Sequence, residues 1–196
     1  RDLLAHDHGR PPRGAREPHH DVRQLRSPVL LQEVPGAADR GVRLAAGPGD
    51  VAQEVPLGSL QQVTDEAFEA GWSSGPLATF RLMKLCYPHL KGDGSIVNLA
   101  SAAGFRWDSS GYSAYGAVKE AIRQLTRGAA CEWAKDGIRT NVILPLAESE
   151  ALKGWAAARP QEAAAYFATI PMRRVGECEA DIGRFVATLC SDDCRY

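Results

Sequence analysis

The chain has no apolar run long enough to cross a bilayer as a helix, which takes about 20 consecutive apolar residues. It also lacks an excess of charge of either sign, because 23 basic and 24 acidic residues leave a net charge of −1. A protein without surplus positive charge has no bulk attraction to nucleic acid or to an anionic membrane. We therefore expect neither a nucleic acid nor a membrane among its partners.

A disulfide framework is also absent, because the five cysteines are odd in number and none of them forms a CxxC pair. Reduced thiols of this kind are typical of the cytosol, so the sequence predicts a cytoplasmic protein. Cys190 and Cys194 are spaced to meet on one face of a helix, but buried or incidental thiols explain them more simply.

The first 50 residues contain no Phe, Trp, Tyr, Ile or Lys, although they hold eight arginines and four of the five histidines. Proline and glycine are scattered through them without a helical or strand period. Such a segment cannot bury much apolar surface, so residues 1–50 are predicted to be irregular, with one weak strand pattern at 27–34. The histidines have no cysteine partners and no regularly spaced carboxylates, so no metal site is predicted.

The composition becomes regular from about residue 51, and a region of this length forms one domain with a sizeable core. Thr64 followed by two acids is typical of a helix start, and Gly75-Pro76 is expected to interrupt the run that follows. Short apolar segments at 95–100 and 138–144 predict buried parallel strands. Further helices are predicted at 79–90, 112–134, 147–168 with a break at Pro160, and 178–189, the last with Ile182, Phe185, Val186 and Leu189 at core spacing. The alternation of strands and helices predicts an α/β fold.

Three polar residues between the two predicted strands stand in a chemically meaningful order. Ser101 ends the first strand, and Tyr115 and Lys119 lie four residues apart on one helix face. A free phenol has a pKa near 10 and is a poor proton shuttle at neutral pH, but a nearby ammonium favours the phenolate. Together these groups are suited to moving a proton on or off a carbonyl or alcohol oxygen while a cofactor moves the hydride.

The order strand, serine, loop, YxxxK helix and strand ending in proline resembles the short-chain dehydrogenase/reductase family over residues 51–196. The resemblance implies a doubly wound parallel sheet (Rossmann-like), incomplete here at the N- and C-terminal ends, and oxidoreduction of an alcohol/carbonyl pair with NAD or NADP. It also implies that Tyr115 is the general acid/base and that Ser101 orients the substrate oxygen. Lys119 is then expected to lower the pKa of Tyr115 and to bind the nicotinamide ribose.

The resemblance implies further contacts as well. Pro145-Leu146 stands where the family commonly has Pro-Gly, so its backbone is expected to meet the nicotinamide carboxamide. The helices at 64–90 and 112–134 correspond to those through which family members assemble, so a homo-oligomer is expected. Phe105 and Trp107, in the loop after Ser101, are equally consistent with contact to a small-molecule substrate and with a cover for the core.

The sequence departs from the family pattern in three places. No glycine-rich TGxxxGxG turn for the cofactor pyrophosphate is present, no Asn lies between residues 51 and 90, and Leu146 replaces a glycine. The change at residue 50 has two explanations: a coding sequence read in the wrong frame upstream, or a diverged or truncated member. A competing hypothesis follows, in which the chain is a catalytically inactive remnant or an interaction module.

Overall fold

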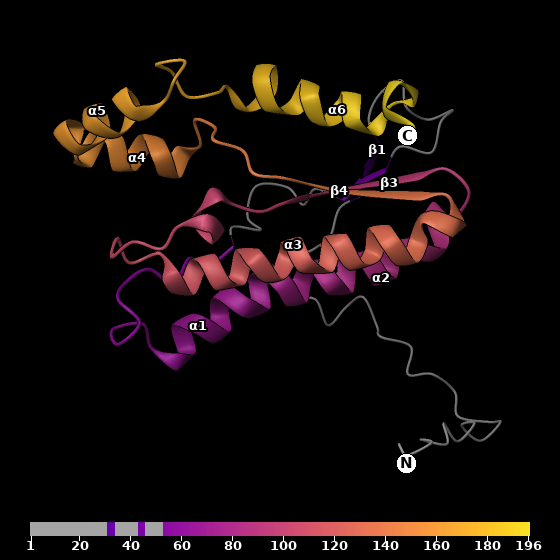
Figure 1. The fold of residues 1–196 in the computed structure, drawn as a ribbon, viewed down its shortest axis with the longest axis horizontal. Helices are drawn as coiled ribbons and strands as arrows, with labels where there is room; N and C mark the ends of the chain where they lie inside the picture. Colours follow the sequence, from indigo (N-terminus) through magenta and orange to yellow (C-terminus); the bar gives the residue numbers. More distant parts are fainter. Residues whose placement is uncertain (1–30, 34–42, 46–52) are drawn as a thin grey trace, which may run out of the picture.

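The computed structural model of the chain describes residues 31–33, 43–45 and 53–196. A parallel pair of strands lies at the centre, with helices above and below it (Figure 1). Strand β3 (Gly94–Leu99) pairs with β4 (Ile138–Ile143) in a register that runs from Gly94↔Ile138 to Leu99↔Ile143. Both strands lie where the apolar segments predict them, and the predicted α/β class is confirmed.

The face below the sheet is covered by a long helical unit and by α3 (Ser113–Trp133) (Figure 1). The unit begins as α1 (Asp65–Trp72), passes through a π-helical segment at Ser73–Leu77 and continues as α2 (Ala78–Leu90). The Thr64 side chain accepts a hydrogen bond from the Ala67 N–H, which confirms the predicted N-cap. The expected interruption at Gly75-Pro76 takes the form of this wider π-helical turn, which separates the two α-helices and accommodates a proline that has no N–H to donate.

The core lies between α3 and the two strands. Val118 and Ile122 on α3 and Ile138 on β4 are almost completely buried. Asn98 of β3 donates a hydrogen bond of 2.9 Å to the Thr126 hydroxyl of α3. A polar residue of the strand is thus satisfied by a side chain of the helix that covers it.

The face above the sheet carries the part of the chain that follows β4 (Figure 1). Helices α4 (Glu150–Ala158) and α5 (Pro160–Thr169) form a hairpin, and the predicted break at Pro160 is confirmed. A π-helical segment (Cys178–Gly183) then leads into α6 (Arg184–Cys190), which is followed by a short turn at Asp192–Cys194.

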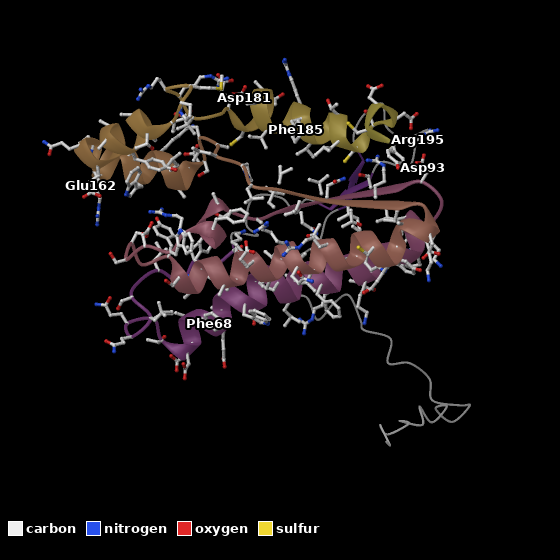
Figure 2. The ribbon with its side chains drawn as sticks, in the orientation of Figure 1. Phe68, Asp93, Glu162, Asp181, Phe185 and Arg195 are labelled. Atoms are coloured by element: carbon white, nitrogen blue, oxygen red, sulfur yellow. The ribbon has the colours of Figure 1, made fainter. Side chains whose placement is uncertain are left out.

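Phe185 on α6 was expected in the core and is instead 54% exposed (Figure 2). Helix α6 lies against β3, its Phe185 side faces the open groove beside β4, and β4 pairs with no strand other than β3 among the described residues. Nothing in the described part of the chain therefore covers this side of the helix, and the predicted core position of Phe185 is wrong.

Two short strands precede this region. Strands β1 (Leu31–Glu33) and β2 (Arg43–Ala45) form an antiparallel pair, and β2 lies against β3. Strand β1 falls inside the weak strand pattern at 27–34. The remaining prediction for residues 1–50, including the arginines and histidines there, lies outside the described residues.

Gly137 ends the turn of 3₁₀-helix at Ala134–Asp136 with a φ of 74°, and a Cβ there would lie 2.6 Å from the Gly92 carbonyl oxygen. Gly137→Ala is therefore expected to lower the free energy of unfolding by about 1–3 kcal/mol. Gly154, within α4, has open space around its Cα, so Gly154→Ala is expected to raise it by about 0.5–1 kcal/mol. Urea unfolding of both variants checks the opposite signs, and equal changes would contradict this description of Gly137.

Candidate active site

Ser101 lies at the carboxyl end of β3, where it caps a short 3₁₀ turn at Ala102–Phe105. Its Oγ accepts a hydrogen bond of 3.2 Å from the Ala103 N–H, and its carbonyl accepts one of 3.2 Å from the Gly104 N–H. The serine hydroxyl is thereby held by the local backbone instead of turning freely in solvent.

Tyr115 and Lys119 occupy the first two turns of α3. The Lys119 ammonium is buried, donates a hydrogen bond of 3.2 Å to the Leu99 carbonyl of β3, and lies 5.6 Å from the centre of the Tyr115 ring. A Cβ on Gly116 would lie 2.9 Å from the Ala103 carbonyl oxygen, so the turn after Ser101 sits directly on the helix backbone. The structure therefore brings the three predicted residues together at one end of β3.

The electrostatics of the pair differ from the sequence expectation. Burial raises the pKa of Tyr115 above its ordinary value, a hydrogen bond with the Ser101 hydroxyl lowers it, and the nearby Tyr112 raises it. Burial also lowers the pKa of Lys119 to about 8. The expected lowering of the Tyr115 pKa by Lys119 is not found, because desolvation of the phenol outweighs the opposing effects. The phenol is therefore protonated at neutral pH, the form that donates a proton to a carbonyl oxygen.

Pro145 and Leu146 follow the carboxyl end of β4, next to the carboxyl end of β3 in the parallel register. Both residues line an open groove of about 470 Å³ between this strand and α6. Leu146 is 38% exposed, and its carbonyl accepts a hydrogen bond of 3.2 Å from the Gly176 N–H. The other lining residues are mostly apolar and are Asn141, Val142, Ile143, Leu144, Ile182, Phe185 and Leu189.

Several side chains near the site were not predicted to be there from the sequence. Tyr112 lies edge-on to Tyr115 with ring centres 6.2 Å apart, and the Arg106 guanidinium lies 5.3 Å from the Tyr112 ring centre. Phe105 and Trp107 are 58% and 100% exposed, so neither covers the core. The tyrosines stand three residues apart on a predicted helix, a spacing that indicates a shared face, but no local pattern indicates the arginine contact.

A sequence model described as enoyl-(acyl carrier protein) reductase matches residues 50–196. This match covers strands β3 and β4, the serine and the YxxxK helix described above. The chain belongs to the short-chain dehydrogenase/reductase family. The family resemblance seen in the sequence is thereby confirmed.

The relatives of this family member include a 12alpha-hydroxysteroid dehydrogenase of Clostridium sp., 42% identical over 146 residues, which are 74% of this chain and 55% of the relative. Among solved structures, the TT0495 protein of Thermus thermophilus aligns with a TM-score of 0.68 and 28% identity, over 79% of this chain and 64% of that one. An NAD⁺-bound xylitol dehydrogenase aligns with a TM-score of 0.62 and 26% identity, over 72% and 60% of the two chains. The chain thus spans about half the length of the curated relative.

Two further observations concern the described part of this short-chain dehydrogenase/reductase chain. No helix there is both long and apolar enough to cross a membrane. No group of three or more histidine, cysteine or acidic side chains gathers there in a way that would hold a metal ion. No disulfide joins any of its five cysteines, all of which lie in that part.

Proposed function

We propose that this chain interconverts an alcohol and a carbonyl with NAD or NADP, and that Ser101, Tyr115 and Lys119 are the residues that carry it out. One observation supports this most directly: a serine that caps a short turn, a half-buried phenol and a buried ammonium lie together at the carboxyl end of β3. The family membership established above supports the reaction class but not the individual roles.

In the proposed reduction, the Ser101 hydroxyl donates a hydrogen bond to the substrate carbonyl oxygen and polarises it. The Tyr115 hydroxyl then gives its proton to the same oxygen, and in the oxidation the phenolate takes that proton back. The raised pKa of Tyr115 favours the acid role at neutral pH. We therefore expect the reduction to prevail near pH 7 and the oxidation to speed up as the pH rises.

The residues near Tyr115 fit the nicotinamide end of the cofactor. One N–H of the Lys119 ammonium goes to the Leu99 carbonyl, and the two others suit the hydroxyls of a ribose. Pro145 and Leu146 follow β4, the strand that pairs with β3, so their backbone is proposed to meet the nicotinamide carboxamide; the apolar groove that they line with α6 includes none of the three catalytic candidates. When bound, NAD(P) supplies or accepts the hydride. The choice between NAD and NADP has no determinant among the described residues.

A second candidate function rests on one feature of the sequence. The chain contains no TGxxxGxG turn for the pyrophosphate, so an inactive family member that acts only through its helical surfaces is the alternative. The two candidates differ in one measurable property, which is cofactor binding by the purified chain.

The substrate is proposed to be a small molecule with a ring-borne alcohol or ketone. The exposed Phe105 and Trp107 after Ser101 offer apolar surface to such a ring, and one relative is a hydroxysteroid dehydrogenase. The test is to incubate the chain with 4-deuterated NADH or NADPH and a panel of cyclic ketones, including ketosteroids. Deuterium at the new carbinol carbon supports the proposal, and no labelled alcohol from any ketone contradicts it.

A cytoplasmic location is proposed as well, because no disulfide joins the five cysteines.

A homo-oligomer through the helices at 64–90 and 112–134 is proposed for the same chain. Phe68, Trp72 and Phe80 are each more than a third exposed on α1 and α2 (Phe68 in Figure 2), and the Phe68 and Trp72 rings stack 6.3 Å apart. Trp72→Glu is expected to weaken self-association at least tenfold, because it places a charge in an apolar interface. Light scattering after size exclusion measures this, with the exposed Trp107→Glu as control. An unchanged oligomer in Trp72→Glu would contradict the assignment.

A further inference from the structure

The turn that begins at Ser101 is held at its other end by α3. The Arg123 guanidinium lies 3.9 Å from the centre of the Phe105 ring, and Phe105 is the last residue of that turn. The same guanidinium is paired with the Glu120 carboxylate on the preceding turn of the helix. The Arg123 side chain is only 16% exposed, so solvent screens these contacts weakly.

A second set of contacts fixes the middle of the turn. A Cβ on Gly104 would collide with the Glu120 carboxylate, and a Cβ on Gly116 would press on the Ala103 carbonyl oxygen. The backbone of the turn therefore contacts α3 at two places: Ala103 lies against Gly116, next to Tyr115, and Gly104 lies against the Glu120 side chain, one helical turn further on. Glycines at both contact points permit this close approach.

We propose that Arg123 and Phe105 are positioning residues that hold the Ser101 hydroxyl in hydrogen-bonding reach of Tyr115. The turn has only four residues and is closed by the hydrogen bonds from Ala103 N–H and Gly104 N–H to Ser101, so it moves as a unit. A displacement of its Phe105 end is therefore passed to its Ser101 end. Neither Arg123 nor Phe105 needs to touch the substrate for this effect.

The proposal rests on the proposed function only in naming Ser101 and Tyr115 as catalytic residues, so its test is done without cofactor or substrate. The chain has five tyrosines, so the signal of Tyr115 must be separated from the other four. Phenolate absorbance is measured against pH in each variant and again in the same variant carrying Tyr115→Phe. The difference between the two curves is the titration of Tyr115. The groups that face this phenol are the Ser101 hydroxyl at the end of β3, and Tyr112 and Lys119 on α3.

Ser101→Ala is expected to raise the measured pKa of Tyr115, because it removes the hydrogen bond that favours the phenolate. Phe105→Leu and Arg123→Ala are expected to shift the pKa in the same direction, by no more than Ser101→Ala does. Phe105→Leu changes no charge, so its shift cannot come from a lost cation. Arg127→Ala, which removes the same charge one turn further along α3, is the control and is expected to leave the pKa unchanged.

A double-mutant cycle decides whether the effect passes through the serine. In a Ser101→Ala background, Phe105→Leu is expected to cause no further shift. A pKa of Tyr115 that stays at the wild-type value in both Phe105→Leu and Arg123→Ala would overturn the proposal, and so would an equal shift with and without Ser101. Arg123→Lys, which keeps the charge but not the planar stacking, serves if Arg123→Ala does not fold.

The same variants give a kinetic readout in the cofactor-bound enzyme. Phe105→Leu is expected to lower kcat about tenfold and to leave NAD(P)H binding unchanged, because a misplaced hydroxyl affects the reacting oxygen and not the cofactor. If Tyr115→Phe keeps full activity, the proposed function is wrong. The titration still tests the positioning of Ser101 by Arg123 and Phe105, because it needs no activity.

Discussion

Tyr115→Phe is expected to lower the rate of alcohol–carbonyl interconversion by about 10²–10⁴-fold, the range by which a positioned general acid or base contributes. Only the phenolic oxygen is removed, and the ring keeps its edge contact with Tyr112. The fold is therefore expected to persist, with an unchanged midpoint of urea unfolding. Initial rates with NADH or NADPH and the best ketone of the panel give the measurement.

The matched control for this variant is Tyr112→Phe. Tyr112 immediately precedes α3 and contacts the Tyr115 ring, but its fourth neighbour is Gly116 and not a lysine. Tyr112→Phe is expected to keep the rate within a few-fold, since its ring and its contact with Arg106 are retained. Full activity of Tyr115→Phe, or an equal loss in both variants, would show that Tyr115 is not the proton donor.

Lys119→Met is expected to lower activity at least a hundredfold and to make the chain more stable at pH 7. Two opposite effects follow from one buried ammonium. The variant loses the charge beside Tyr115 and the donors proposed for the ribose. It also loses a charge that folding takes out of water, and a methionine of similar length packs there without that cost.

The sign of the stability change follows from the pKa of Lys119, which burial lowers from 10.5 to about 8. Between pH 8 and 10.5 the unfolded chain binds more protons at this site than the folded chain. The cost of the buried charge is thus complete below pH 8 and disappears as the pH rises through this window. The full shift corresponds to about 3 kcal/mol, and the lost hydrogen bond to Leu99 reduces the expected net gain to about 1–2 kcal/mol.

Urea unfolding at pH 7 and pH 10.5 measures this difference. Lys119→Met is expected to be more stable than the parent chain at pH 7 and to lose that advantage at pH 10.5. The exposed Lys135 provides the control, because Lys135→Met removes the same charge from the surface. A Lys119→Met chain that is less stable than the parent at pH 7 would contradict the assignment of a costly buried ammonium.

The parts of the site that the sequence predicted are those fixed by local pattern. Strand, serine and YxxxK helix follow from apolar periodicity and spacing, and the structure places Ser101, Tyr115 and Lys119 together as that order implies. The direction of the Tyr115 pKa was not accessible in this way, because it depends on how many atoms of other elements surround the phenol. The contact between Arg123 and Phe105 likewise joins residues 18 positions apart that share no repeating pattern.

The differences between the predicted and the observed fold have the same origin. Phe185 follows the apolar spacing of a core helix, but burial requires a neighbour, and no further strand lies beside β4 among the described residues. Gly75-Pro76 predicted an interruption because proline disfavours an α-helix, but the form of the interruption, a π turn in which Gly75 and Pro76 are both buried, was not visible in the local sequence. In both cases tertiary packing decided what the local sequence left open.

The central claim is that this chain holds a nicotinamide cofactor against Tyr115. The most direct test is to titrate the purified chain with NADH and NADPH and to follow nicotinamide fluorescence, with Lys119→Met as the matched variant. We predict saturable binding of one or both cofactors by the parent chain and at least tenfold weaker binding by Lys119→Met. No binding of either cofactor up to about millimolar concentration, the upper end of typical KM values, would contradict a nicotinamide site at Tyr115 and favour the inactive family member.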